Sequence, residues 1–218
     1  MRLEFAERMR CPRPHAPTPL IIVASRSVER ELVEGVAGCM ICHLEARVTA
    51  GNVIFPGAQV PVAIDVSLAI PQQSAELAPV DPTALERLIA LLGLAEPGGA
   101  VLLTGRYAGL AASLAQQIDV TAIVLNAQAT SGESVSAVRL AEPVVPFSDH
   151  TFRAVALDSD TALPVLVDAV RALQVGGRVL GALPLERPRG VRELARDATE
   201  WVGEREVGVG GIVRIERR

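Results

Sequence analysis

The chain has 218 residues, half of them hydrophobic, and a formal net charge of −4. This length suits one domain of ordinary size with a small appendage, and no apolar run reaches the roughly 18 residues that a membrane-spanning helix needs. All 21 basic residues are arginine, which excludes Schiff-base and phosphate-loop lysines, and the negative charge with 3% aromatic residues argues against nucleic-acid binding.

The first 56 residues are predicted to form a small unit of their own. An apolar stretch at residues 20–24 and a Gly51-Asn52 turn between two short apolar runs indicate two short hairpins. The opening residues have no signal-peptide pattern, so we expect a cytoplasmic protein without a membrane segment.

All three cysteines lie in this unit, at Cys11, Cys39 and Cys42. Cys39 and Cys42 have the spacing of a zinc knuckle, and Cys11 can pair with His15 four residues later. We therefore predict a closed, structural zinc site formed by these four residues, with His43 as a substitute for His15. The alternative is that the cysteines are free and buried.

Residues 57–80 are rich in proline, alanine and glutamine and are predicted to be a linker, with one extended piece at residues 60–64. Asp81-Pro82 is typical of a helix start, because aspartate caps the first N–H groups and proline suits the first helical position. This helix should end before residues 97–99, which read Pro-Gly-Gly.

From there to the end of the chain, short apolar runs alternate with helical patterns. Strands are expected at residues 100–103, 121–125, 154–157, 178–183 and 211–215. Helices are expected at residues 108–117, 132–139, 162–173 and 191–202. This alternation predicts an α/β domain over residues 81–218, a Rossmann-like, mostly parallel sheet with helices on both faces.

Two segments of this domain resemble the class I (type 11) methyltransferases that use S-adenosylmethionine. Residues 145–155 read VPFSDHTFRAV and resemble the family's LPF-x-D-x-[ST]-F-D-x-V stretch. Residues 170–180 read VRALQVGGRVL and resemble its R-x-L-K-P-G-G helix-to-strand turn. The N-terminal cysteines are similar to the zinc ribbon that some bacterial members carry, except that His15 replaces a cysteine. The resemblance implies a methyltransferase fold.

The resemblance also implies where the cofactor would bind, and there the pattern is incomplete. Of the glycine loop, Gly105 and Gly109 are kept, while Tyr107 replaces the middle glycine. Asn126 stands where a carboxylate should hold the ribose. Glu142 is the neighbour of the position expected to hold the adenine. Glycines in such a loop let the backbone approach a ligand closely, although a tight turn needs them as well.

Asp158 and Asp160 follow a predicted strand, at the edge of an α/β sheet where ligands bind. Either could be a catalytic base or a substrate contact, with Asp158 the catalytic candidate, and the alternative is that they cap the helix starting near Thr161.

We expect a methyltransferase-like protein with weakened or lost cofactor binding that serves as a scaffold, with the ribbon contacting a protein partner. One alternative is an active methyltransferase, because methyl transfer needs mainly alignment of the reactants. Another is a nucleic-acid-binding ribbon, which would need a basic face. The arginines available for that face are Arg8, Arg10, Arg13 and Arg26.

Overall fold

A computed structural model describes residues 1–58, 81–126 and 134–207 of the chain. The predicted strand at residues 211–215, the extended piece at 60–64 and nearly all of the 57–80 linker lie outside the described residues.

The described residues contain eleven strands and five helical segments. The strands are β1 (Ile21–Val28), β2 (Glu31–Gly38), β3 (Glu45–Thr49), β4 (Asn52–Ile54), β5 (Ala100–Leu103), β6 (Thr121–Leu125), β7 (Val135–Arg139), β8 (Phe152–Leu157), β9 (Leu173–Ala182), β10 (Val191–Arg196) and β11 (Glu200–Arg205). The helices are α1 (Leu3–Ala6), α2 (Pro82–Leu92), α3 (Ala111–Ile118) and α4 (Leu163–Ala172), with a 3-10 helix, η1 (Gly105–Leu110), between β5 and α3.

All eleven strands belong to one sheet, in the order β1-β2-β3-β4-β7-β6-β5-β8-β9-β11-β10. The five strands from β7 to β9 are parallel and follow the Rossmann order, in which the first strand lies at the centre and the chain winds outward to both sides. Antiparallel β11 is inserted between β9 and β10. The predicted Rossmann-like α/β fold is confirmed.

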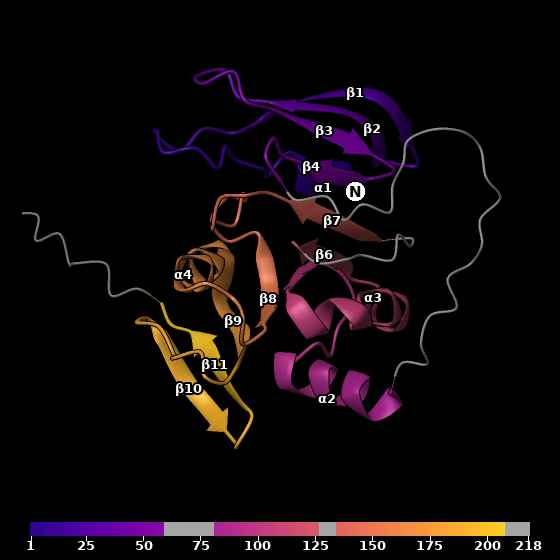
Figure 1. Cartoon of the computed structure of the whole chain (residues 1–218). Helices are drawn as coiled ribbons and strands as arrows, with labels where there is room; N and C mark the ends of the chain where they lie inside the picture. The colour runs from indigo at the N-terminus through magenta and orange to yellow at the C-terminus, as the bar shows by residue number, and fades with distance from the viewer. Residues whose placement is uncertain (59–80, 127–133, 208–218) are drawn as a thin grey trace, which may run out of the picture.

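Helices cover both faces of the parallel strands, as predicted (Figure 1). Helix α4 packs on one face, and α2 and α3 pack on the other, each over its own buried apolar cluster. Every residue of β5 and β6 is buried, which is expected of strands covered on both sides. Within the described ranges, no helix has the length and apolar character required to cross a membrane.

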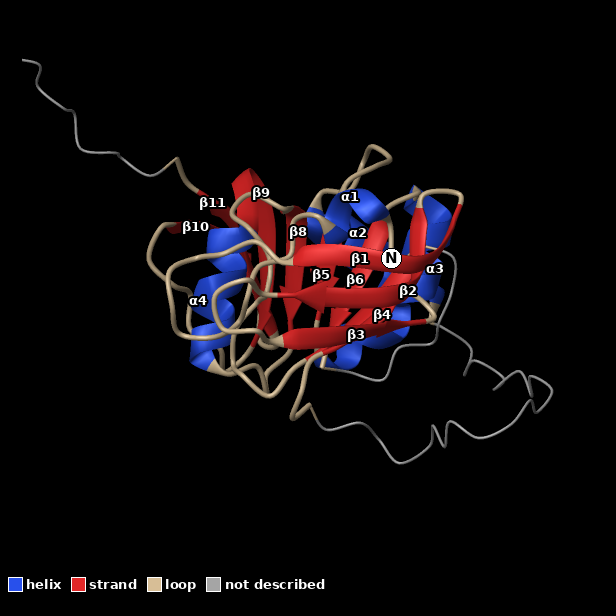
Figure 2. Ribbon diagram, turned by 90° about the horizontal axis from the view of Figure 1, so that it is seen from above, coloured by secondary structure: helices blue, strands red, loops and turns tan. Residues whose placement is uncertain are grey.

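The N-terminal strands extend the same sheet. The two predicted hairpins are confirmed as β1–β2 and β3–β4, and β4 pairs in parallel with β7. Buried apolar residues of this ribbon, such as Phe5 and Met9, belong to the same apolar cluster as Phe147 of the Rossmann part. Figure 2 shows the ribbon strands running nearly crosswise to β8 and β9, because the strand twist accumulates across the sheet.

The helix predicted at residues 132–139 is wrong, because Val135–Arg139 forms strand β7. Four of its five residues are buried, and it pairs with β6 on one side and with β4 on the other. A five-residue run of small and branched side chains fits helix and strand patterns equally, and the pairing with the ribbon decides for the strand.

The helix predicted at residues 191–202 is also wrong, because this segment forms the β10–β11 hairpin. Leu194 and Trp201 fit a helical spacing, yet Leu194 is 38% exposed and Trp201 only 1%. Trp201 is part of the core, as predicted, but it reaches the core from a strand that pairs with β9 opposite Gly181. A side chain at Gly181 would begin 2.5 Å from the indole ring, so this glycine makes the room that the ring fills.

The helix predicted after residue 81 is confirmed, together with the residues that begin and end it. The Asp81 carboxylate accepts a hydrogen bond from the Thr83 N–H at 2.9 Å, and Gly93 ends α2 in the left-handed conformation.

Candidate functional site

The four predicted metal ligands lie together at the end of the ribbon. The ligand atoms of Cys11, His15, Cys39 and Cys42 are all within 4.8 Å of one another. Cys11 Sγ lies 3.6 Å from Cys42 Sγ and 3.1 Å from His15 Nε2, and Cys39 Sγ lies 3.5 Å from the same nitrogen. With metal–ligand bonds of roughly 2.0–2.3 Å, the edges of a tetrahedron measure about 3.5–3.8 Å, near the three separations above, so these four residues could hold one zinc ion.

The surroundings of His15 and Cys39 also suit a metal. His15 Nδ1 lies 2.7 Å from the Ala16 carbonyl oxygen, so Nδ1 carries the proton and Nε2 presents its lone pair to the cluster. Burial acts to raise the pKa of Cys39, but the backbone N–H groups of Cys42 and Ile41 outweigh it and lower the pKa. These N–H groups favour the thiolate, which is the form that binds metal.

His43 is not part of the cluster. His43 adopts the left-handed backbone conformation, with φ 54°, and its backbone N–H donates to the Cys39 carbonyl oxygen at 3.0 Å. This closes the turn that carries Cys39 and Cys42. Of the two histidines proposed from the sequence, the structure brings His15 to the three sulfur atoms.

The candidate cofactor residues gather at the carboxyl edge of the parallel strands. Gly105 follows β5, Asn126 follows β6 and Asp158 follows β8. The switch in winding direction between β5 and β8 lies at this edge, where open α/β sheets bind their ligands. A pocket of about 880 Å³ lies elsewhere, beside the β1–β2 turn and α3 at the opposite edge.

Asp158 fills the space that Gly105 leaves. A side chain at Gly105 would begin 2.4 Å from the Asp158 carboxylate, and Gly105 itself is left-handed with φ 48°. The Asp158 oxygens accept hydrogen bonds from the Arg106 N–H and the Ser159 N–H, each at 2.7 Å. Helix α4 begins later, at Leu163, so Asp158 does not cap it. Its side chain is 15% exposed, and its oxygens are taken by the loop.

The hydrogen bonds to Asp158 should make stability depend on pH. Burial alone would raise its pKa, but the N–H groups of Arg106 and Ser159 hold the pKa below the ordinary 3.8. A depressed folded pKa stabilises the protein above the unfolded value, and this contribution is lost as pH falls through the folded pKa.

We expect Asp158→Asn to lower the urea midpoint at pH 7, and the difference from wild type to shrink below about pH 4. Asp160→Asn, at an exposed neighbouring position, is the matched control. A difference between wild type and Asp158→Asn that stays constant from pH 7 to pH 3 would contradict this.

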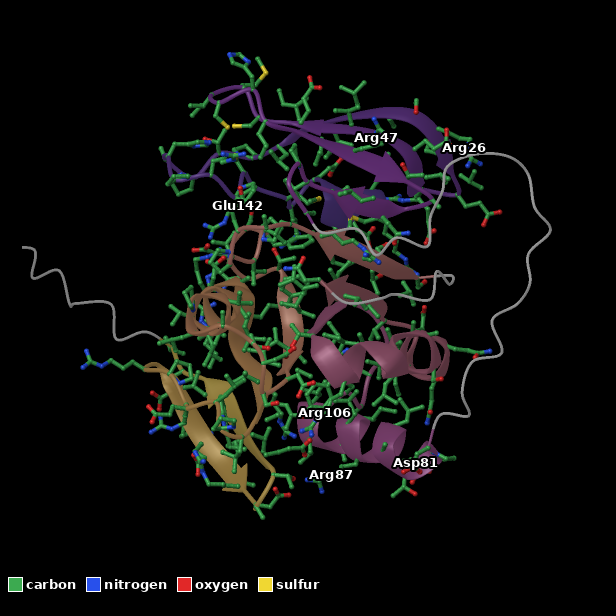
Figure 3. All side chains as sticks on the ribbon, viewed as in Figure 1. Arg26, Arg47, Asp81, Arg87, Arg106 and Glu142 are labelled. Carbon is green, nitrogen blue, oxygen red and sulfur yellow. The ribbon has the colours of Figure 1, made fainter. Side chains whose placement is uncertain are left out.

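Tyr107 is held by contacts inside the protein. Its ring is buried among the side chains under α2 and α3, and its hydroxyl donates to Glu200 Oε1 at 2.7 Å. Burial, followed by the hydrogen bond to Glu200, raises the pKa of Tyr107, which is therefore a neutral donor. Arg87 and Arg106 bind the same carboxylate, at 2.8 and 3.1 Å, between α2 and β11 (Figure 3).

The other two candidate contacts are also engaged inside the protein. The Asn126 side-chain oxygen accepts a hydrogen bond from the Leu140 N–H at 2.9 Å and holds the chain after β7. Glu142 forms an ion pair with Arg13 of the ribbon, at 3.2 Å. Figure 3 shows Glu142 at the boundary between the ribbon and the parallel strands. The sequence alone contains no signal for these pairings, because their partners lie far away in the chain.

Three of the four ribbon arginines considered for a basic face have acidic partners. Arg10 pairs with Asp168, Arg13 with Glu142 and Arg26 with Glu34. The fourth, Arg8, contacts the His150 carbonyl oxygen at 3.5 Å.

No protein-family model matches the chain, and no curated protein matches it. Several solved structures similar to part of it are methyltransferases. A geranyl diphosphate methyltransferase in complex with SAM is 21% identical, with a TM-score of 0.39, over 46% of this chain and 48% of that one. A geranyl diphosphate C-methyltransferase from Streptomyces coelicolor A3(2) is 17% identical, with a TM-score of 0.37, over 45% and 42%.

A third similar structure is phosphoethanolamine N-methyltransferase 2 from Haemonchus contortus, 19% identical with a TM-score of 0.40. The match covers 48% of this chain and 29% of that one. This chain thus spans less than half the length of these proteins, and the fold assignment rests on the strand order of the sheet. The chain has a Rossmann-like α/β fold joined to a small ribbon that carries a Cys/His cluster.

Proposed function

We propose that this protein is a methyltransferase-fold scaffold that has lost most of its affinity for S-adenosylmethionine, and that one structural zinc ion holds its ribbon. The observation that carries the proposal is that the candidate cofactor residues are engaged in contacts within the protein. Asp158 occupies the space over Gly105, and the side chains of Tyr107, Asn126 and Glu142 bond to other parts of the protein. A ligand would have to break these contacts, so these residues do not fit the cofactor.

The zinc proposal rests on the distances within the cluster and on the orientation of His15. Cys11, His15, Cys39 and Cys42 supply four protein ligands. A zinc ion there would have no open coordination position, and its role would be structural. The proposed ribbon comprises residues 1–56, and the proposed Rossmann domain comprises residues 81–218.

A partner is proposed to be a protein that contacts the ribbon. Strand β1 is at the edge of the sheet, and seven of its eight residues are exposed. Val23 is 63% exposed, and Met40 and Ile41 at the knuckle are 68% and 55% exposed. An exposed edge with apolar side chains suits addition of a strand from a protein. The acidic partners of the ribbon arginines disfavour nucleic acid. A cytoplasmic location remains part of the proposal.

Titration calorimetry tests the loss of cofactor binding. We expect no heat and no thermal shift with millimolar S-adenosylmethionine or S-adenosylhomocysteine. A dissociation constant of tens of micromolar or tighter would sink the proposal and favour an active methyltransferase. Adding zinc to metal-stripped protein is the positive control for the thermal-shift measurement, because zinc binding there should raise the melting temperature.

A further inference from the structure

The N-terminal segment that carries the first two metal ligands pairs with a long connection of the Rossmann part. This connection, residues 140–151, leads from β7 to β8 and contains no helix. Two of its backbone groups bond to the N-terminal segment, and others bond to side chains of α4. The Arg10 N–H donates to the Pro146 carbonyl oxygen at 3.1 Å, and the Ser148 N–H donates to the Arg8 carbonyl oxygen at 2.8 Å. These backbone groups would otherwise need water or a helix.

Two arginines beside the cluster, Arg10 and Arg13, form ion pairs with carboxylates of α4 and of the connection. Arg10 Nη2 donates to Asp168 Oδ1 at 2.7 Å, and both side chains are less than one-fifth exposed. Asp168 belongs to α4, and its second oxygen accepts the Val145 N–H at 2.7 Å. One carboxylate thus ties together the metal-bearing segment, the connection and the helix.

Arg13 lies between the ligands Cys11 and His15 and reaches Glu142 at the cofactor edge. Within the described part of the chain, the buried Glu142 Oε2 atom has no hydrogen-bond partner, and Arg13 is the cation that pairs with this carboxylate. If Arg13 moved away, a partly buried charge would lose its partner, and the carboxylate would have to move toward water.

We propose that metal occupancy of the cluster sets the conformation of residues 140–151 through Arg10 and Arg13, so that the ribbon is a metal-dependent latch on one wall of the cofactor edge. The inference rests on the proposed zinc site. Losing the metal releases the segment from Cys11 to His15, and with it the partners of the connection. The latch links the ribbon to the Rossmann part, so that zinc binding in the ribbon affects the conformation of residues 140–151.

Hydrogen–deuterium exchange of the full chain tests this, with zinc bound and after a chelator has removed it. We expect exchange to rise at least about tenfold in residues 8–20 and in residues 140–151, and to stay unchanged in the β10–β11 hairpin. A rise confined to residues 8–43 would overturn the latch. Elemental analysis of the starting protein separates the two proposals, because a chain purified without metal and unable to bind zinc defeats the site itself.

A variant that keeps the metal covers the case in which the stripped protein unfolds. Arg13→Gln should retain one zinc per chain and still show faster exchange around Glu142. Arg26→Gln, which breaks a surface pair with Glu34 on the same ribbon, is the matched control and should leave residues 140–151 unchanged. Equal exchange in Arg13→Gln and wild type would refute the role of Arg13.

Discussion

Cys39→Ser is expected to remove the zinc and to lower the melting temperature of the whole protein by about 10 °C or more. Zinc binding to a structural site contributes directly to folding free energy, and a loss of about 5 kcal/mol shifts a domain of this size by about 10–20 °C. The effect should reach the Rossmann part, because Phe5 and Met9 of the ribbon share a core with Phe147.

Calorimetry with elemental analysis measures this effect. Wild type should contain one zinc per chain and melt in one transition, and Cys39→Ser should contain none. His43→Asn is the control, since His43 lies outside the cluster and asparagine tolerates its left-handed backbone. The prediction is wrong if both variants keep the zinc, or if Cys39→Ser melts like wild type.

Trp201→Ala is expected to reduce the free energy of unfolding by about 3–5 kcal/mol. The indole is 1% exposed and packs over Gly181, and its N–H donates to the Leu185 carbonyl oxygen at 2.7 Å. Alanine would leave a cavity and an unpaired carbonyl group in the strand-to-strand connection. Urea unfolding followed by circular dichroism measures the change.

Leu194→Ala is the control that separates the hairpin from the helix expected at residues 191–202. On that helix Leu194 would share the buried face of Trp201, and its truncation would cost about 2–5 kcal/mol. In the hairpin its side chain is 38% exposed, so we expect a loss below about 1 kcal/mol. Comparable losses in the two variants would argue against the hairpin.

The elements that the sequence predicts correctly are indicated by residues within or next to them. Asp81 and Gly93 bound α2, and the apolar runs of β5 and β6 are long and uninterrupted enough to indicate buried strands. The spacing of the cysteines likewise indicates the metal cluster. The segments predicted wrongly, at residues 132–139 and 191–202, are those whose partners are distant: β4 of the ribbon pairs with β7, and β9 pairs with β11.

The sequence by itself determined the α/β alternation, the two pairs of candidate metal ligands and the incomplete glycine loop, because each depends on residues close together in the chain. Only the tertiary structure decided that His15 rather than His43 joins the cysteines, and that Asp158 fills the space beside Gly105. It also decided that Arg13 of the ribbon holds Glu142. Such contacts depend on how distant segments pack, and local propensity and spacing carry no information about that packing.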